Sequence, residues 1–434
     1  MGTRNFIFIG DFKSLKEAFT SPQSTNRPFL FSFDAFSNYK RLGFVNNTGQ
    51  SIQNLRRFTL THLRNAGMGK SSMENIIRYE LECLIKEFKK DEGKPVEIPY
   101  SLNVAIINIL WKVLADVRFD VSDKKIQEFE KLIADLFIHA QHPLMFIFDQ
   151  YPILPKLIPH FIQAKLGLAP LFNIWDQLID FLKKAIDDHL SSLDEENPRD
   201  FIDAFLIQMK AKENGKENEK NFNFTYEELL YCLSDMFSAG SETTASTFRW
   251  TILYLTKYPE VQKKVHEEID KALPRDRLPT LLDKDKLVYT QAVINEALRL
   301  NPIAMFGLQH TFDEEFEIKG YCIPKDAIVM PSIIMCHHDP DYWEDPKVFK
   351  PERFITPEGK LDINKEGFLP FSIGRRNCIG ETLARTELFF FVVGILQNFK
   401  FEAPEDVEIS TEPDKNRPFF LTPNPFKIIM TVRD

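Results

Sequence analysis

The chain has 434 residues, of which 44% are hydrophobic and 27% charged, the balance of a soluble globular protein that can bury a large core. Its formal net charge of −9 argues against non-specific nucleic-acid binding, which needs a basic footprint. Five cysteines without CxxC spacing argue against a disulfide framework or a zinc ribbon. The longest apolar run, 388–396, is about half of the roughly 20 residues that a membrane span needs.

The N-terminal part is predicted to begin with a strand and to continue mainly as helices. The apolar run 6–9 predicts a buried strand, and because it starts almost at the first residue we expect that the front of the protein is missing. Apolar residues at helical spacing predict a helix over 11–19, whereas the Phe-rich stretch 29–36 lacks a clean period and is expected to be a loop. Further helices are predicted at 52–63, 73–88 and 102–114, the last buried.

The middle of the chain contains one long helix. Four prolines and many large apolar residues in 142–159 predict a loose lid or a membrane-touching surface, and the charged stretch 210–220 predicts an exposed loop. Thr225 and Glu228 form a predicted capping box, and nothing breaks the pattern that follows until Pro259. A helix of about 30 residues would be about 45 Å long, enough to cross a whole domain.

The C-terminal part adds helices and short strands. A helix is predicted at 288–300, strands at 316–318 and 328–330, and a last helix at 380–397. No repeat, low-complexity tract or linker divides the chain. The sequence therefore predicts a single domain over 1–434 that is mainly α with a small β-rich lobe.

A lone cysteine lies in a glycine-rich loop directly before the last predicted helix. Gly374 permits a tight turn and Gly380 a close approach of another group to the backbone. Cys378 then lies near a helix N-terminus, and Arg376 adds positive charge, so both favour a thiolate. A lone Cys is usually a small buried hydrophobe, but this setting favours either a metal ligand or a nucleophile.

Two helical patterns carry weaker signals. Glu296 and Arg299 share one helix face, as such pairs do on many surface helices. In the long helix, the sequence 239–244 is Ala-Gly-Ser-Glu-Thr-Thr. A mid-helix Gly240 costs about 1 kcal/mol against Ala, so beside threonine it suggests a distortion in which a hydroxyl or a water enters the backbone ladder. A surface Ser/Thr patch is the simpler alternative.

The loop Phe371-x-x-Gly374-x-Arg376-x-Cys378-x-Gly380 resembles the haem-binding loop of the cytochrome P450 family at every defined position. The resemblance covers essentially the whole chain, with three further motifs in the family's order: 239–244, Glu296-Ala-Leu-Arg299 and Pro351-Glu-Arg353-Phe354. It implies the fold of this family and a haem-dependent monooxygenase, which inserts one oxygen atom from O2 into a substrate.

The resemblance also implies roles for single residues. Cys378 would be the thiolate ligand of the haem iron, and its electron donation would favour O–O cleavage. Thr243 would donate a hydrogen bond to dioxygen at the iron, and Glu242 would relay protons as the acid. Glu296, Arg299 and Arg353 would form a buried structural triad.

Haem propionates would be bound by a separate set of residues. Several segments resemble the animal microsomal branch of the family, in which an arginine and a tryptophan hold a propionate. Arg56 is present at the arginine position, but Ile52 replaces the tryptophan, so one hydrogen bond is expected to be lost. His310 occupies a propionate-binding position, and Arg376 completes the expected haem-binding set. The cluster 336–339 looks like a metal site but matches a structural turn of the family.

The expected partners follow from what the chain lacks. No glycine-rich dinucleotide fingerprint appears, so NADPH would act only through a flavoprotein reductase, with cytochrome b5 as a second candidate partner. The microsomal branch implies attachment to the cytosolic face of the endoplasmic reticulum through an anchor that precedes this sequence. A basic docking face for the reductase would be formed by Arg56, Arg57, Arg64, Lys70 and Arg375.

The substrate pocket is expected to be apolar and to bind a lipophilic small molecule: a steroid, fatty acid, isoprenoid or xenobiotic. Steroid hydroxylation and xenobiotic metabolism are therefore both open. Two alternatives remain: a haem-thiolate isomerase or dehydratase, which usually lacks the Glu242-Thr243 pair, and an inactive haem-binding remnant. The expected pocket residues are Phe29 to Phe36, Ala239, Thr243, Phe306 to Leu308, Phe419 and Phe420.

Overall fold

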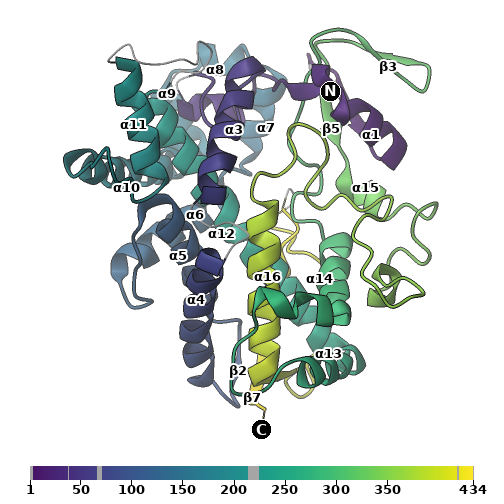
Figure 1. Cartoon of the computed structure of the whole chain (residues 1–434). Coiled ribbons are helices and arrows are strands. Elements are labelled where there is room, and N and C mark those ends of the chain that lie inside the picture. The colour runs from purple at the N-terminus through teal and green to yellow at the C-terminus, as the bar shows by residue number, and fades with distance from the viewer. Residues whose placement is uncertain (1–2, 38, 66–70, 214–223, 418–419, 434) are drawn as a thin grey trace.

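The computed structural model describes residues 3–37, 39–65, 71–213, 224–417 and 420–433. Helices make up most of the molecule, and small sheets lie at two places near its periphery (Figure 1). The predicted mainly α architecture with a small β-rich lobe is therefore confirmed. Lys70 and Phe419, which were predicted to serve in the docking face and the pocket, lie outside the described residues.

The larger part is built from long helices around two central ones, α12 (Tyr226–Lys257) and α16 (Glu381–Asn398). The run 388–396 lies in α16 and is entirely buried, so it is a core segment. Among the described residues no helix is both long and apolar enough to cross a bilayer. The surrounding helices are α3 (Gly49–Asn65), α4 (Ser71–Lys89), α5 (Ser101–Ala115), α6 (Lys124–His139), α10 (Ala169–Ser191), α11 (Phe201–Glu213), α13 (Pro259–Ala272) and α14 (Val288–Leu300).

The β-rich lobe is formed by segments from both ends of the sequence. β1 (Phe6–Ile9) pairs in parallel with β5 (Ile328–Pro331), and β3 (Phe316–Ile318) and β4 (Tyr321–Ile323) form a hairpin beside α1 (Phe12–Thr20) (Figure 1). The strand at 6–9 and the helix near 11–19 are confirmed, but the strand is not buried as predicted, because Phe8 is 52% exposed and only Ile9 is buried. β5 leads into α15 (Ile333–His337), and the second sheet has the order β2 (Pro95–Val96), β7 (Ile428–Val432), β6 (Phe399–Glu402).

One local prediction is wrong. The stretch 29–36 is not a loop, because it forms the short helix α2 (Phe31–Asp34) and a following helical turn (Ala35–Ser37), and the Asp34 side chain accepts from the backbone N–H of Leu30. The stretch 142–159, predicted as a loose lid or a membrane-touching surface, contains the helices α7 (Pro143–Gln150) and α8 (Leu154–Leu157) and is followed by α9 (His160–Gln163). Proline starts α7 because the first helical turn needs no N–H there.

The long helix is confirmed, with two differences from expectation. Thr225 caps α12 by accepting from the N–H of Glu228, but the Glu228 carboxylate bonds Gly43 and Asn47 instead of closing the capping box. The helix is continuous through Gly240. A Cβ at Gly240 would lie 2.7 Å from Cδ1 of Leu110 on α5, so this glycine permits close packing of the two helices.

Candidate haem-binding and catalytic site

The loop before α16 holds Cys378 in a fixed place. Gly374 has a φ of +83°, and a Cβ there would lie 1.8 Å from the carbonyl oxygen of Phe19, so only glycine fits the turn. The N–H of Cys378 donates to the carbonyl of Phe371 at 2.9 Å. Gly380 caps α16, where a Cβ would be in ordinary contact with Sγ of Cys378 at 3.8 Å. The chain's own atoms thus require glycine at 374 but not at 380.

The Cys378 side chain has accessible surface although protein atoms surround it, as expected for a ligand that faces an internal space. Burial raises the pKa of the Cys378 thiol, against the lowering effect of the backbone N–H groups of Gly380 and Glu381 and the charge of Arg56. The N–H groups at the helix N-terminus thus act in the predicted direction, and coordination to a metal would favour the thiolate further. Arg56 adds a positive charge that the sequence prediction for Cys378 did not include.

Three guanidinium groups lie close together without a carboxylate contact. Arg56 Nη2 donates to the backbone carbonyl and the side-chain oxygen of Asn377, at 2.8 and 3.0 Å. Arg376 donates only to backbone carbonyls at 44, 45 and 47, and Arg27 only to those at 45, 308 and 309. In the part of the chain that the structure describes, none of the three forms an ion pair.

The protein balances the charge of this cluster only in part: burial and the charge of Arg56 lower the pKa of Arg376, and the negative charge of Asp235 acts in the opposite direction. Burial lowers the pKa of Arg27 well below its usual value, and the positive charges of Arg376 and Arg56 lower it further. His310 is also buried; burial and the charge of Arg27 lower its pKa, while its Nδ1–H donates to the carbonyl of Ser24. Buried like charges persist where a ligand of opposite charge is bound. The two propionates of haem fit this cluster.

A stripe of accessible residues runs along the middle of α12. Ala239 is exposed and Thr243 half-buried, although the helix around them is mostly buried. Their spacing of four places them on one helix face. The Thr243 hydroxyl donates to the carbonyl of Ala239 at 2.6 Å, so the hydroxyl does enter the backbone ladder, without breaking the helix. The accessible face of α12 therefore presents a hydroxyl.

Glu242 points to a different set of partners. Arg417 Nη1 donates to its Oε1 at 2.7 Å, and the Ser246 hydroxyl donates to the same oxygen at 3.3 Å. Its Oε2 accepts from Nδ2 of Asn103 at 3.4 Å. The carboxylate beside Thr243 in sequence is thus bound by groups from α5, α12 and the C-terminal segment, and it is largely buried.

The predicted triad residues are in direct contact. Arg299 Nε and Nη2 donate to the two oxygens of Glu296 at 2.7 and 2.8 Å, and Arg353 Nε donates to Oε1 at 2.9 Å. All three side chains are almost fully buried. Here the carboxylate satisfies both guanidinium groups.

The segment 336–339 links the triad to the loop 371–380 that carries Cys378, here called the cysteine loop. His337 Nδ1 donates to the carbonyl of Arg299, and its Nε2 accepts from the N–H of Leu369, two residues before Phe371. Burial lowers the pKa of His337 to about 3, so the ring is neutral and suited to this bridging role. Both ring nitrogens are used, which agrees with the structural interpretation of this segment.

The expected pocket residues do not all converge. Phe306 packs against the exposed ring of Phe8 with centroids 5.4 Å apart, and Phe31 packs against Phe148 on α7. Leu308 is 37% exposed next to the arginine cluster, and Phe420 contacts Phe137 on α6. Ala239, Leu308 and Phe420 remain the better candidates, because Phe306 and Phe31 belong to separate apolar clusters.

The predicted docking residues do converge. A surface cavity of about 380 Å³ is lined by Arg56, Arg57, Arg64 and Arg375, together with Arg376 and Ile52. These side chains come from α3 and from the cysteine loop, so the basic surface lies directly over the segment that carries Cys378.

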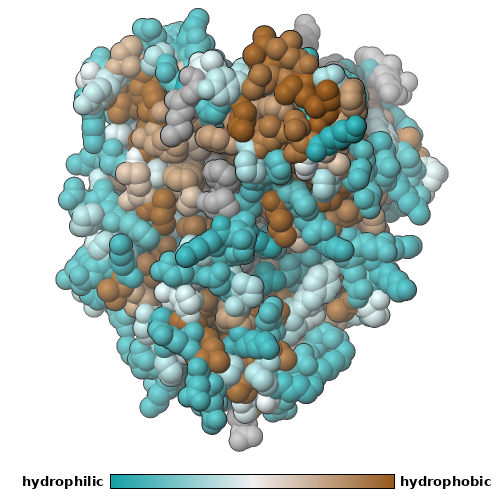
Figure 2. Space-filling view, turned by 180° about the vertical axis from the view of Figure 1, so that it is seen from behind, coloured by the Kyte–Doolittle hydropathy of each residue, from teal (hydrophilic) through white to brown (hydrophobic). Residues whose placement is uncertain are grey.

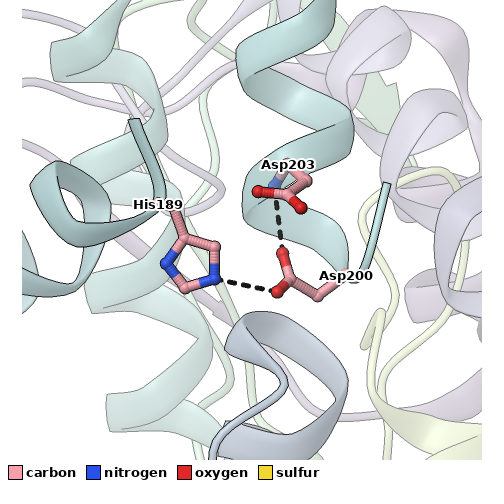
Figure 3. Close-up of side chains that lie close together, drawn as sticks. All are labelled: His189, Asp200 and Asp203. Atoms are coloured by element: carbon pink, nitrogen blue, oxygen red, sulfur yellow. Dashed lines mark hydrogen bonds and ion pairs between the residues drawn. The ribbon is translucent and has the colours of Figure 1, made fainter. Parts of the chain in front are cut away.

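One cluster outside this site resembles a metal site but is fully paired. His189 Nε2 lies 2.8 Å from an oxygen of Asp200, whose other oxygen accepts from the N–H of Asp203 (Figure 3). Both oxygens of Asp203 accept from Arg199, and His189 Nδ1 bonds the carbonyl of Ala185. The cluster joins α10 to the start of α11, and no oxygen or nitrogen in it lacks a partner.

Sequence analysis missed two residues of the site. Arg27 lies in an irregular segment with no motif, and Arg417 lies close to the C-terminus; both reach the site across more than 150 residues of sequence. Only the surplus of basic residues in predicted loops could have pointed to them.

The comparisons with known proteins agree with this geometry. Residues 1–430 match the family model described as Cytochrome P450. A Panulirus argus protein named cytochrome P450 2L1 is 39% identical over 434 residues, covering 100% of this chain and 87% of that protein. The farnesoate epoxidase of Bombyx mori is 34% identical over 100% of this chain and 85% of its own, and human cytochrome P450 2U1 is 35% identical over 98% and 77%.

Proposed function

The chain belongs to the cytochrome P450 family of haem-thiolate monooxygenases, and on this premise we propose that Cys378 is its axial ligand and that it oxidises a lipophilic small molecule. When bound, haem with a thiolate ligand supplies the reductive activation of O2. One observation carries the residue assignment. The accessible sulfur of Cys378 lies next to Arg56, in an arginine cluster that has no direct carboxylate contact among the described residues.

We assign the haem propionates to Arg27, Arg56, Arg376 and His310. The hydrogen bonds of the three arginines to backbone carbonyls hold the guanidinium groups in place without cancelling their charge. A carboxylate beside His310 would raise the pKa that burial now depresses, and the ring could then donate from both nitrogens. Charge-assisted hydrogen bonds of this kind are about twice as strong as neutral ones.

We assign the delivery of protons to Thr243 and Glu242. The Thr243 hydroxyl lies on the accessible face of α12 and can exchange its bond to the Ala239 carbonyl for one to a bound molecule. The neighbouring residue Glu242 supplies a carboxylate. It is hydrogen-bonded to Asn103 and Ser246, on the side away from that face. The pair supports an oxygenase over the isomerase or dehydratase alternative.

The substrate class follows from the apolar surroundings of the site. Ala239, Leu308 and Phe420 contribute accessible apolar surface, which suits a steroid, fatty acid, isoprenoid or xenobiotic. One relative is named for epoxidation of farnesoate, an isoprenoid acid, and others carry only family names. We therefore place isoprenoid acids among the first compounds to be screened.

Electrons are proposed to enter over the basic surface formed by Arg56, Arg57, Arg64 and Arg375. This surface presents positive charge over the cysteine loop. Because the whole protein has a net charge of −9, such a local basic patch would orient an acidic partner toward this side of the molecule. An NADPH-dependent flavoprotein reductase with an acidic face is the proposed partner, and cytochrome b5 would compete for the same surface.

A separate apolar surface supports a peripheral contact with the endoplasmic reticulum membrane. Figure 2 shows an apolar patch at the top of the molecule, over the region of α7 to α9. Replacing Ile153 and Leu157 by lysine should reduce binding to phospholipid vesicles, whereas Leu282→Lys on an isolated exposed leucine should not; equal binding of all variants would remove this proposal. The most exposed patch residues are Ile153 (63%), Leu157 (70%), Phe161 (63%) and Leu166 (50%).

A spectrum tests the ligand assignment. Reduced protein with carbon monoxide should show the red-shifted absorption band that a thiolate ligand produces. Cys378→His should keep haem through the arginine cluster but lose that band, and Cys336→Ser, at a buried cysteine, should keep it. A red-shifted band in the Cys378→His protein would overturn the assignment of the ligand.

A further inference from the structure

A second buried carboxylic acid lies behind Glu242. Glu130 is on α6 and is only 3% exposed. Its Oε1 accepts from Nδ2 of Asn103 at 2.7 Å and from the Ser241 hydroxyl at 3.2 Å. The same Nδ2 of Asn103 also lies 3.4 Å from Oε2 of Glu242. One amide group on α5 therefore connects the two carboxyl groups across the interface of three helices.

The charges around this pair are unequal. Arg417 contacts Glu242 directly. Glu130 has no direct cationic contact among the described residues: Arg249 donates to Oδ1 of Asn103 and acts on Glu130 only at a distance. Burial, and the negative charge of Glu242, raise the pKa of Glu130 to about 7. Glu130 is thus able to hold a proton or to lose it near neutral pH.

Glu130 also lies near the protein surface. Tyr100, at the start of α5, is 40% exposed, and its hydroxyl bonds the carbonyl of Gln127, one turn before Glu130 on α6. Burial and the charge of Glu130 raise the pKa of Tyr100, which places the phenol within electrostatic reach of the carboxyl group. Tyr100 therefore lies near Glu130 at the surface end of this helix interface, without a hydrogen bond to it among the described residues.

A purely structural carboxylate in the same helix bundle has a different arrangement. Glu80, also 3% exposed, accepts from an asparagine of α5, Asn108, but it is neutralised by Arg118 Nε at 2.6 Å. Glu130 also accepts from an asparagine of α5, but no arginine contacts its carboxyl group among the described residues. The missing neutralisation is costly for a structural role, because a buried charge needs a partner, and it is suited to a group that exchanges a proton.

We propose that Glu130 is a second proton-carrying residue, which resupplies Glu242, the two carboxyl groups being held near each other by the amide of Asn103. This rests on the proton role proposed above for Glu242. In each transfer the Glu130 carboxyl gives its proton to the Glu242 carboxylate and becomes a carboxylate itself. It then takes a proton from solvent, so no net charge is left behind. Asn103 and Ser241 are positioning residues in this path.

The test uses the haem-loaded enzyme with an NADPH-dependent reductase and 7-ethoxycoumarin as the lipophilic probe. Glu130→Gln keeps the hydrogen-bonding shape and removes the exchangeable proton. Product formed per NADPH should fall about tenfold in favour of hydrogen peroxide, with a larger solvent isotope effect and a flat pH profile between about pH 6 and 8. Glu130→Asp should recover part of the loss.

Glu80→Gln is the matched control, because it removes a buried carboxylate that also bonds an asparagine of α5. If it changes the yield and the isotope effect as much as Glu130→Gln does, the proposal is overturned. A second readout needs no turnover: the infrared difference between native and Glu130→Gln protein should contain one protonated-carboxyl band that titrates near neutral pH, separate from those of Glu228 and Asp235, whose pKa burial also raises to about 7. A native protein without such a band also overturns it.

Glu242→Gln separates this proposal from the proposed function. If Glu242→Gln leaves the product yield unchanged, the proton role of Glu242 fails, and the Glu130 path fails with it. If Glu242→Gln lowers the yield and Glu130→Gln does not, only the Glu130 path fails. If both lower it and the double variant loses no more than Glu242→Gln alone, the two residues act in series, as proposed.

Discussion

Two arginine clusters in this molecule differ in whether the protein neutralises them. Arg299 and Arg353 share the carboxylate of Glu296, so that cluster is complete within the chain. Arg27, Arg56 and Arg376 donate to backbone carbonyls and to the side chain of Asn377, and their charges repel one another. The difference separates a structural ion-pair network from a binding site, since the second cluster has only the distant charge of Asp235 to oppose it and can accept an anionic ligand.

The largest effect is expected from breaking the complete cluster. Glu296→Ala leaves two buried guanidinium groups with backbone carbonyl partners but without a carboxylate, a loss of about 3–5 kcal/mol of unfolding free energy. Haem incorporation should be abolished, because Arg299 is bonded through His337 to the cysteine loop. Urea unfolding and the haem-to-protein ratio measure the two effects.

The control is the neighbouring Glu352, whose exposed carboxylate pairs with Lys264. Glu352→Ala should cost less than about 1 kcal/mol, as surface ion pairs do. Normal haem content in the Glu296→Ala protein would contradict the role given to the triad.

Breaking the incomplete cluster should act on the ligand and not on the fold. Arg56→Gln keeps a donor for Asn377 and removes one positive charge from a site where the charges repel. Unfolding free energy of the haem-free protein should change by less than about 1 kcal/mol, while haem should dissociate about tenfold faster, as for loss of one charged hydrogen bond. Transfer of haem to an excess of apomyoglobin measures this rate, and an unchanged rate would exclude Arg56 from propionate binding.

The smallest effect is expected at the exposed end of the basic surface. Arg64→Glu should slow reduction by the flavoprotein several-fold at low salt and much less at about 0.5 M salt, because exposed charges are then screened. Lys124→Glu, an exposed lysine on α6, should leave the rate unchanged. Equal rates for both variants at low salt would remove the docking proposal.

Much of the fold was predictable because its signals are local. Helical spacing located α1, α5, α12, α14 and α16 to within a few residues, since the period of a helix is a property of neighbouring residues. The prediction of a loop at 29–36 was wrong because local spacing was not enough there. The short helix is held by the bond of Asp34 to Leu30 and by the packing of Phe31 against Phe148, more than 100 residues away.

The sequence by itself determined the turn from Phe371 to Cys378, the Glu296–Arg299 pair and the hydroxyl of Thr243, because each depends on a contact within one turn or one loop. The tertiary structure decided which distant groups join them. Arg27 and Arg417 enter the site from opposite ends of the chain, and Glu130 reaches Glu242 only because α5, α6 and α12 pack together. Charge balance in a buried site depends on these long-range approaches, and sequence spacing does not contain them.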